Sequence, residues 1–212
     1  MKLTKYEHAC FVVEKDNKTI VVDPGAFTTD FTIPANVVAV IVTHEHSDHF
    51  DLTQLEAIID KNPQAVIIGP GDVTDKLSDF KTITVHGRDE IIVEGINLDF
   101  YGNEHAVIHS SLPQIENVGV LIDETIYYPG DSFTIPTKPV EVLALPVAAP
   151  WLKISETIEF MKTVSARITF PTHDAILSTK GTSLVDSLLG MFAESADTKY
   201  QRIDDETIDI AQ

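Results

Sequence analysis

The stretch from Thr43 to Asp51 constrains this chain more than any other. It reads Thr-His-Glu-His-Ser-Asp-His-Phe-Asp, so three histidines and an aspartate fall within residues 44–49. An unbroken apolar run, residues 37–42, comes directly before it. A short β-branched run of this kind is typical of a buried strand. The histidines are therefore predicted to lie where a buried strand ends in a loop.

Extended backbone would let this stretch bind metal. Residues i and i+2 of an extended chain point the same way, so we expect His44 and His46 to face one ion together. Asp48 and His49 follow as the chain bends, and we expect them to face a second ion nearby. Imidazole and carboxylate suit Zn, Mn, Fe or Ni. The alternative is a polar loop with solvated histidines, but this density of ligand-type residues after a buried strand favours a metal site.

Composition narrows the choice of partners. The 212 residues include 15 Lys and Arg against 33 Asp and Glu, a formal net charge of −18. A chain this acidic repels phosphate backbones and anionic membranes, so we expect neither nucleic acid nor membrane as a partner. Cys10 is the only cysteine, which excludes an intrachain disulfide. The first residues lack an apolar signal segment and no run is long enough to span a membrane, so a cytoplasmic protein is expected.

The hydrophobic pattern predicts strands and helices in both halves of the chain. Runs 8–14 and 18–23 predict a hairpin, and Asp51 is expected to cap a helix that stops at Asn62-Pro63. Further strands are predicted at 65–69, 83–85, 91–93, 96–101, 118–122, 125–128, 140–145 and 167–170, and further helices at 72–77, 154–161 and 180–194. The inward faces of the helices after Asp51 and at 180–194 are expected to carry Leu52, Leu55, Ile58 and Ile59, and Leu184, Val185, Leu188 and Leu189.

The spacing His-x-His-x-Asp-His over residues 44–49 resembles the signature of the metallo-β-lactamase fold superfamily. The later chain supplies His105, Asp131 within Pro-Gly-Asp-Ser, and His173 within Pro-Thr-His-Asp, in the order expected for that family. The resemblance covers nearly all of the chain. It implies an α/β (α+β) protein, a four-layer αββα sandwich forming a single domain over residues 1–212. In that family the ligand loops gather along one edge of the sandwich.

The same resemblance implies a binuclear metal site. One ion would be held by His44, His46 and His105, the other by Asp48, His49 and His173, with Asp131 bridging the two. The expected cofactors are two divalent transition-metal ions, with zinc as the first choice and Mn, Ni or Fe as alternatives. A metal-bound hydroxide would be the nucleophile, and Asp48 could accept its proton. His109 lies four residues from His105 and competes with it as a ligand. Otherwise His109 is expected to line the pocket or to stabilise oxyanion charge.

Of three further residues, Asp23 and Trp151 have two readings each. Asp23, before Pro24-Gly25, could hold a ligand histidine by its free ring nitrogen or cap the turn. His8 is a lone histidine beside an apolar run, for which a structural role is expected. Trp151 belongs either to the core or to the wall of an apolar pocket.

The overall layout is similar to the compact branch of the superfamily that includes L-ascorbate-6-phosphate lactonase and metal-dependent hydrolases. This implies an enzyme that hydrolyses a small ester, lactone or phosphoester. The alternatives are a non-catalytic metal-binding or structural protein and a nuclease of the same superfamily. A full ligand set favours the enzyme, because a structural site needs only one closed, four-ligand ion. The absence of a dense basic run in the sequence argues against the nuclease. Association into a homo-oligomer is left open.

Overall fold

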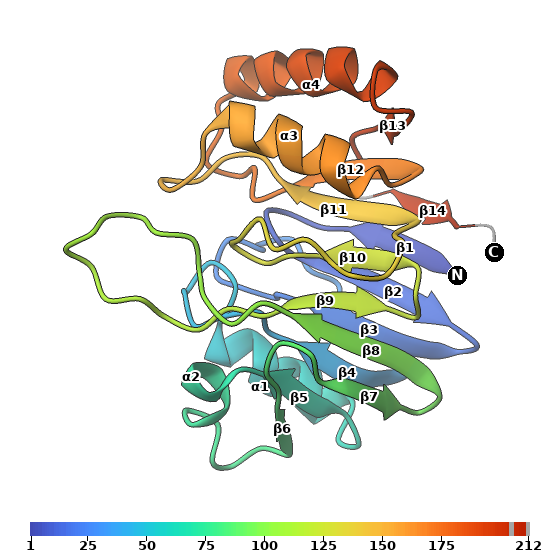
Figure 1. The fold of residues 1–212 in the computed structure, drawn as a ribbon. Coiled ribbons are helices and arrows are strands. Elements are labelled where there is room, and N and C mark those ends of the chain that lie inside the picture. Colours follow the sequence, from blue (N-terminus) through green and yellow to red (C-terminus); the bar gives the residue numbers. More distant parts are fainter. Residues whose placement is uncertain (204–205, 211–212) are drawn as a thin grey trace.

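Two β-sheets face each other in the computed structural model, which describes residues 1–203 and 206–210 (Figure 1). The first sheet has the order β14-β1-β2-β3-β4-β5-β6 and the second the order β13-β12-β11-β10-β9-β8-β7. The first sheet contains β1 (Lys2–Lys5), β2 (Phe11–Lys15), β3 (Lys18–Val22), β4 (Val37–Ile41), β5 (Val66–Gly69), β6 (Thr82–Thr84) and β14 (Thr207–Asp209). The second contains β7 (Glu90–Val93), β8 (Ile96–Tyr101), β9 (Gly119–Ile122), β10 (Ile126–Tyr128), β11 (Val142–Pro146), β12 (Ile168–Thr172) and β13 (Lys199–Tyr200).

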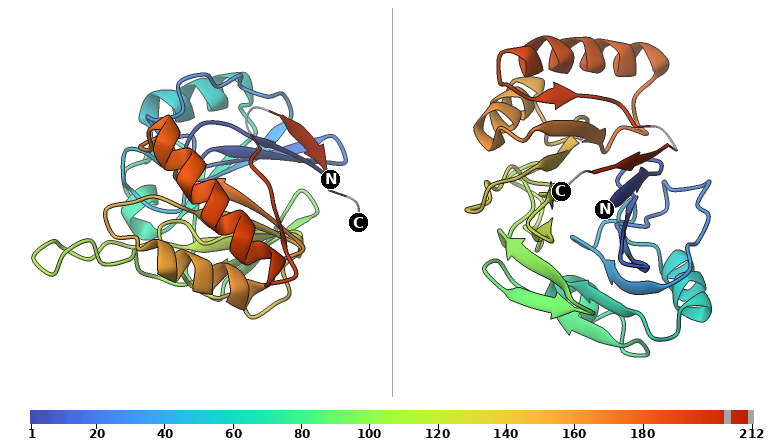
Figure 2. Two further views of the ribbon diagram at one scale, coloured as in Figure 1. Left: turned by 90° about the horizontal axis from the view of Figure 1, so that it is seen from above. Right: turned by 90° about the vertical axis from the view of Figure 1, so that its right-hand side faces the viewer.

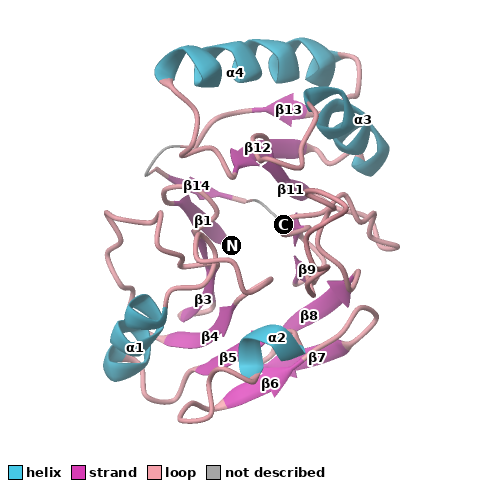
Figure 3. Ribbon diagram, turned by 90° about the vertical axis from the view of Figure 1, so that its left-hand side faces the viewer, coloured by secondary structure: helices cyan, strands magenta, loops and turns pink. Residues whose placement is uncertain are grey.

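Helices cover the outer face of each sheet (Figures 2 and 3). The first sheet carries α1 (Leu52–Lys61) and α2 (Gly71–Thr74), and the second carries α3 (Ile154–Val164) and α4 (Thr179–Glu194). The predicted αββα layering is thereby confirmed. Asp51 caps α1 as expected, because its Oδ1 accepts the backbone N–H of Gln54 at 2.9 Å. Among the described residues, none of the helices has the length and apolar character needed to cross a membrane.

Strand alternation divides the core into three apolar layers. In β3, Ile20 points between the two sheets, while Val21 points toward α1. Successive side chains of a strand face opposite sides, so one strand supplies two layers at once. In the second sheet, Tyr128 faces the other sheet and Tyr127 faces α3 and α4. Because both faces of each sheet are buried, the central strands are continuous apolar runs in the sequence, and such runs predict buried strands.

The strand directions bring the predicted ligands to one edge. β3 and β4 run parallel, and β10, β11 and β12 form a second parallel group. Asp23 follows β3 directly and His173 follows β12 directly, while the Thr43–Asp51 loop follows β4. Carboxyl ends of parallel strands share one edge of a sheet, so residues far apart in sequence meet there.

Some local predictions were wrong. The short strands β1, β13 and β14 were not predicted, since each has only two to four residues and lies at or near a sheet edge. The helix expected at 72–77 is the single turn of α2. Leu184 was placed inward, yet it is 62% exposed, because α4 contacts the core through Val185 and Leu189. Leu52, expected on the inner face of α1, is 44% exposed.

Candidate metal centre

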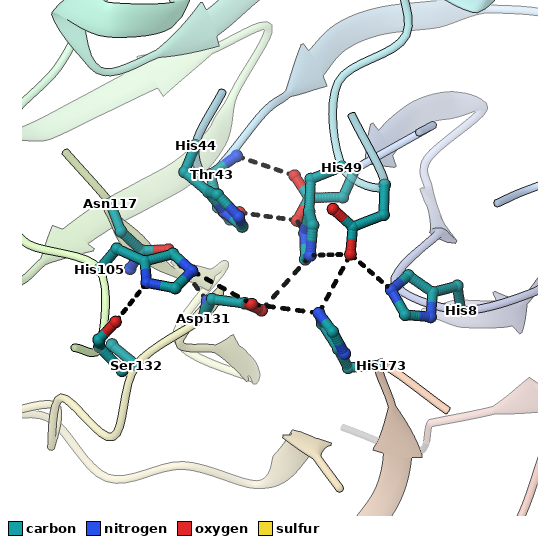
Figure 4. A network of polar contacts seen from close by, with 12 residues as sticks. His8, Thr43, His44, His49, His105, Asn117, Asp131, Ser132 and His173 are labelled. Carbon is teal, nitrogen blue, oxygen red and sulfur yellow. Dashed lines mark hydrogen bonds and ion pairs between the residues drawn. The ribbon is translucent and has the colours of Figure 1, made fainter. Parts of the chain in front are cut away.

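Histidine and aspartate side chains converge at this edge in two groups (Figure 4). The first group consists of His44, His46, His105 and Asp131, and the second of His8, Asp48, His49 and His173. Within each group the candidate ligand atoms all lie within 4.8 Å of one another. The structure thus brings together all seven residues expected as ligands, and it adds His8.

The carboxylate of Asp131 spans the two groups. Its Oδ1 lies 3.3 Å from His49 Nε2, while its Oδ2 lies 3.1 Å from His173 Nε2 and 3.3 Å from His105 Nε2. Trp151 Nε1–H donates to the same Oδ2 at 2.8 Å. This is the position that the bridging prediction requires. It also gives Trp151 a contact that neither of its two readings included.

Asn117 holds the turn that carries Asp131. Its Oδ1 accepts the backbone N–H of Asp131 at 2.9 Å, and its Nδ2 donates to the carbonyl oxygen of Pro129 at 2.9 Å. Gly130, between Pro129 and Asp131, has a φ of 64°, a left-handed conformation that glycine adopts without strain. Sequence reasoning missed Asn117, because it lies in an apparently ordinary polar loop.

Four buried histidines are oriented by their Nδ1 atoms. Each Nδ1–H donates to an oxygen: His44 to Thr43 Oγ1 (3.1 Å), His49 to Asp23 Oδ2 (2.6 Å), His105 to the Ala106 carbonyl (2.5 Å) and His173 to the Ala148 carbonyl (2.5 Å). Carbonyl and carboxylate oxygens can only accept. Thr43 Oγ1 gives its own hydrogen to Asp23 Oδ2 at 2.7 Å, so it accepts from His44. Nδ1 therefore carries a proton in all four rings, and a second proton or a metal ion can be held only on Nε2.

The remaining ring nitrogens fit metal ions. The four Nε2 atoms and Asp131 Oδ1 are buried and make no hydrogen bond within the described chain. Three of these Nε2 atoms face carboxylate oxygens at 3.1–3.3 Å. When such a ring is neutral, its Nε2 lone pair and the carboxylate oxygen repel each other at that separation, and a proton or a metal ion relieves the repulsion. The donor set of imidazole nitrogen and carboxylate oxygen is the one that zinc and other first-row metals take.

The pKa shifts of the metal-free protein reflect the same preference for a cation. Burial tends to lower the pKa of His173, but the carboxylates of Asp131 and Asp48 outweigh it and raise that pKa to about 10. Burial would raise the pKa of Asp131, yet the charges of His49 and His173 hold it well below its usual range. For His44, burial first and then nearby His49 lower the pKa well below 6.5, so its ring is neutral. Without metal, the positive charge of protonated His173 therefore balances part of the negative charge of the carboxylates.

Asp23 supports the histidine loop from beneath. Its Oδ1 accepts the backbone N–H of Thr43 at 2.8 Å, and its Oδ2 accepts His49 Nδ1–H. The side chain is fully buried, and its backbone is left-handed with a φ of 43°. Of its two readings, the geometry matches the one in which Asp23 holds a candidate ligand histidine.

His105 and His109 occupy different environments. His105 is 4% exposed and belongs to the first group. His109 is exposed and lies on the segment 102–118, which projects from the body between β8 and β9 (Figures 1 and 2). Its Nδ1 is 2.8 Å from Ser111 Oγ. A shallow cleft joins the two histidines to His46, and its other walls are Ala106, Val107, Ile108, Leu112, Pro113, Gln114 and Ile115.

Known proteins are similar to this chain in sequence or in architecture. A family model described as Beta-lactamase superfamily domain matches residues 2–173. Protein Rv0786c of Mycobacterium tuberculosis is 31% identical over 212 residues, which cover 98% of each chain. A UPF0173 metal-dependent hydrolase of Staphylococcus aureus is 29% identical over 173 residues, covering 69% of this chain and 73% of its own. Igni18, a novel metallo hydrolase from Ignicoccus hospitalis, matches with a TM-score of 0.77 at 18% identity, with 99% of each chain covered.

The fold and the edge cluster define a protein of the metallo-β-lactamase type. Because the family model covers most of the chain, the chain belongs to the β-lactamase superfamily. Its relatives include proteins named as metal-dependent hydrolases. The likeness to Igni18, at 18% identity, shows the fold alone.

Proposed function

We propose that this protein is a metal-dependent hydrolase with a binuclear site. The observation that carries the proposal is the set of four buried Nε2 atoms that lie in the two groups around Asp131 and have no hydrogen-bond partner among the described residues. His44, His46 and His105 would hold one ion, Asp48, His49 and His173 the other, and Asp131 would contact both. Zinc is the first choice. Divalent ions held there would supply Lewis acidity and lower the pKa of a water molecule.

Other roles in the proposed hydrolysis fall to side chains of the protein itself. The Asp48 side chain is 20% exposed, the most open of the three carboxylates in the cluster, so it can accept a proton from water. Trp151 and Asn117 hold Asp131 in one orientation. His109, at the rim of the cleft, is placed to donate to an oxyanion if the segment 102–118 closes over a substrate.

The lining of the cleft bears on the substrate class. Six of its ten residues are apolar, and none is Lys or Arg. Val107 and Leu112 are 63% and 53% exposed there. The proposed ions could themselves hold one anionic group, but the lining offers no Lys or Arg to bind further negative charge, whereas a small ester or lactone needs none. We therefore propose ester or lactone hydrolysis in the cytoplasm. The resemblance to L-ascorbate-6-phosphate lactonase stays a prediction about the lactone chemistry.

Metal content and turnover test the proposal together. Protein purified without chelator should contain one to two transition-metal ions per chain by elemental analysis. A panel of γ-lactones, esters and phosphodiesters, with Zn, Mn or Ni supplied in turn, should show turnover of lactones or esters. The double variant His44→Ala/His46→Ala should lose metal and activity, while His86→Ala, an exposed histidine outside the cluster, should keep both.

Three outcomes would count against the proposal. Stoichiometric metal retained by the double variant would show that the ligands are assigned wrongly. Full metal content without turnover of any panel member would support a structural metal protein. Salt-sensitive binding and cleavage of RNA would instead support a nuclease, against the net charge of −18.

A further inference from the structure

His8 lies inside the second group without sharing the orientation of its neighbours. Its ring is buried, and its Nε2 lies 3.0 Å from Asp48 Oδ2. By distance alone it would count as a ligand of the second ion, together with Asp48, His49 and His173. The hydrogen bonds of the ring decide otherwise.

The proton of His8 is on the opposite nitrogen from that of the other buried histidines. The backbone N–H of Ala175 points at His8 Nδ1 at 3.3 Å, and an amide can only donate. His8 Nδ1 must therefore accept, which leaves the proton of a neutral ring on Nε2. Nε2–H then donates to Asp48 Oδ2. Neither nitrogen has a free lone pair for a metal ion.

Backbone contacts fix the ring of His8 in this place. The His8 carbonyl oxygen accepts the backbone N–H of His173 at 3.0 Å. The ring packs against His173 and Phe27, with centroids 4.1 and 5.0 Å away. His8 has a φ of 57°, a left-handed conformation that non-glycine residues rarely adopt. Its backbone conformation is thus held by tertiary contacts, among them the one to His173, the residue that follows β12.

The oxygen that His8 contacts is the one that faces the second group. Asp48 Oδ2 is also 3.3 Å from His173 Nε2 and 3.7 Å from His49 Nε2. We propose that His8 is a positioning residue: its Nε2–H holds Asp48 so that Oδ2 faces His49 and His173, with which it would hold the second ion, and His8 itself would not be a ligand. The inference rests on the proposed metal site. Partners of this kind commonly change metal affinity by about 10–100-fold when removed.

Nitrogen-15 NMR of the histidine rings tests the hydrogen bonds directly. In the metal-free protein and after addition of Zn²⁺, His8 should show the Nε2–H form with an unmetallated ring. Zn²⁺ should shift Nε2 of His44, His49, His105 and His173. A His8 ring protonated on Nδ1, or a zinc-shifted His8 nitrogen, would overturn the proposal.

Two variants test the consequence for metal binding. His8→Gln keeps an amide donor near the position of Nε2, whereas His8→Leu has similar size and no donor. Zn²⁺ affinity, measured by chelator competition, should fall about 10–100-fold for the more weakly held ion in His8→Leu. His8→Gln should recover most of that loss. His86→Leu, on the exposed surface, serves as the control.

Thermal unfolding of the metal-free variants separates positioning from packing. His8→Leu and His8→Gln should unfold at similar temperatures while differing in Zn²⁺ affinity. Equal affinities in the two variants would overturn the proposal, as would a loss of affinity that follows the loss of stability. If the unaltered chain bound no zinc, the proposed function itself would fail. That result is distinct from failure of the His8 assignment, in which the unaltered chain binds zinc and its His8 ring has the wrong proton.

Discussion

At the scale of single residues, proton placement distinguishes ligands from supports. Four buried histidines give Nδ1–H to protein oxygens and leave Nε2 free, while His8 does the reverse. Left-handed backbone recurs in the cluster, at His8, Asp23 and His173. Such conformations cost energy and persist where surrounding contacts over-determine them. The cluster is therefore held in place by hydrogen bonds within the chain.

Gly25 illustrates how closely the supporting turn approaches the histidine loop. A Cβ at this position would lie 2.0 Å from the backbone oxygen of Asp48 and 2.4 Å from the backbone nitrogen of His49. Gly25→Ala should therefore push the loop away. It should lower the free energy of unfolding by roughly 1–3 kcal/mol and weaken metal binding as well.

Gly190 provides the matched control for that substitution. It lies within α4, and a Cβ there would meet no atom within 4 Å. Gly190→Ala should stabilise the protein by up to about 1 kcal/mol through helix propensity and leave metal binding unchanged. Urea denaturation and elemental analysis of both variants measure these effects. Equal stability of the two variants would show that the Gly25 contact is easily relieved.

At the scale of elements, the segment 102–118 is tied firmly at its base. Asp72 and Glu116 exchange reciprocal bonds, since each backbone N–H donates to the other's carboxylate at 2.9 Å. The Asn117 contacts to the Asp131 turn lie beside this clamp. Farther along, Val107 and His109 are exposed. The segment therefore has a fixed base, while its outer part carries an exposed apolar side chain and an exposed imidazole, which suits contact with a substrate.

The two histidines of this segment should respond differently to removal. His105→Ala should weaken metal binding strongly, because its buried Nε2 faces Asp131 Oδ2. His109→Ala should leave the metal content unchanged and lower turnover, since its ring lies at the rim of the cleft. Elemental analysis and steady-state kinetics on the same preparations distinguish the two. The reverse pattern would make His109 the ligand.

At the scale of the whole molecule, folding gathers buried charge at one edge of the sandwich. Asp23 and Asp131 are almost fully buried and Asp48 largely so, in a chain of net charge −18. Buried carboxylates are costly unless cations or hydrogen bonds compensate them. In the metal-free protein, protonated His173 supplies part of that compensation. Stability should therefore depend on pH and metal together.

The pH dependence has a definite sign. The pKa of His173 rises from the usual 6.5 to about 10 in the folded state, so its stabilising contribution is complete below pH 6.5 and lost as pH rises through about 10. The lowered pKa of Asp131 acts at the other end, contributing above its ordinary 3.8 and disappearing as pH falls further. Metal-free protein should thus lose stability in urea between pH 6.5 and about 10.

Metal should remove this alkaline loss. A divalent ion on His173 Nε2 replaces the proton, so zinc-saturated protein should keep its stability over the same range. His173→Ala should flatten the dependence in the metal-free protein. Metal-free protein that is equally stable in urea at both ends of the range would contradict the assigned proton on His173.

Much of the fold could be predicted because its core strands are buried on both faces. The runs at 37–42 and 140–145 became β4 and β11, and Asp51 became the cap of α1. Those signals are local, since each depends on residues within one segment. The short strands β1, β13 and β14 and the exposed face of α4 could not be predicted, because long-range pairing and helix orientation decide them. Leu184 is exposed for that reason.

The sequence by itself determined which residues could bind metal, because so many histidine and carboxylate side chains directly after a buried strand are hard to explain in any other way. It also set the charge that argues against nucleic acid. Only the tertiary structure decided how those residues divide into supports and candidate ligands. It placed Asp23 beneath His49, Trp151 and Asn117 around Asp131, and His8 against Asp48. The physical reason is that a histidine's function depends on which ring nitrogen holds the proton, and partners distant in sequence determine that.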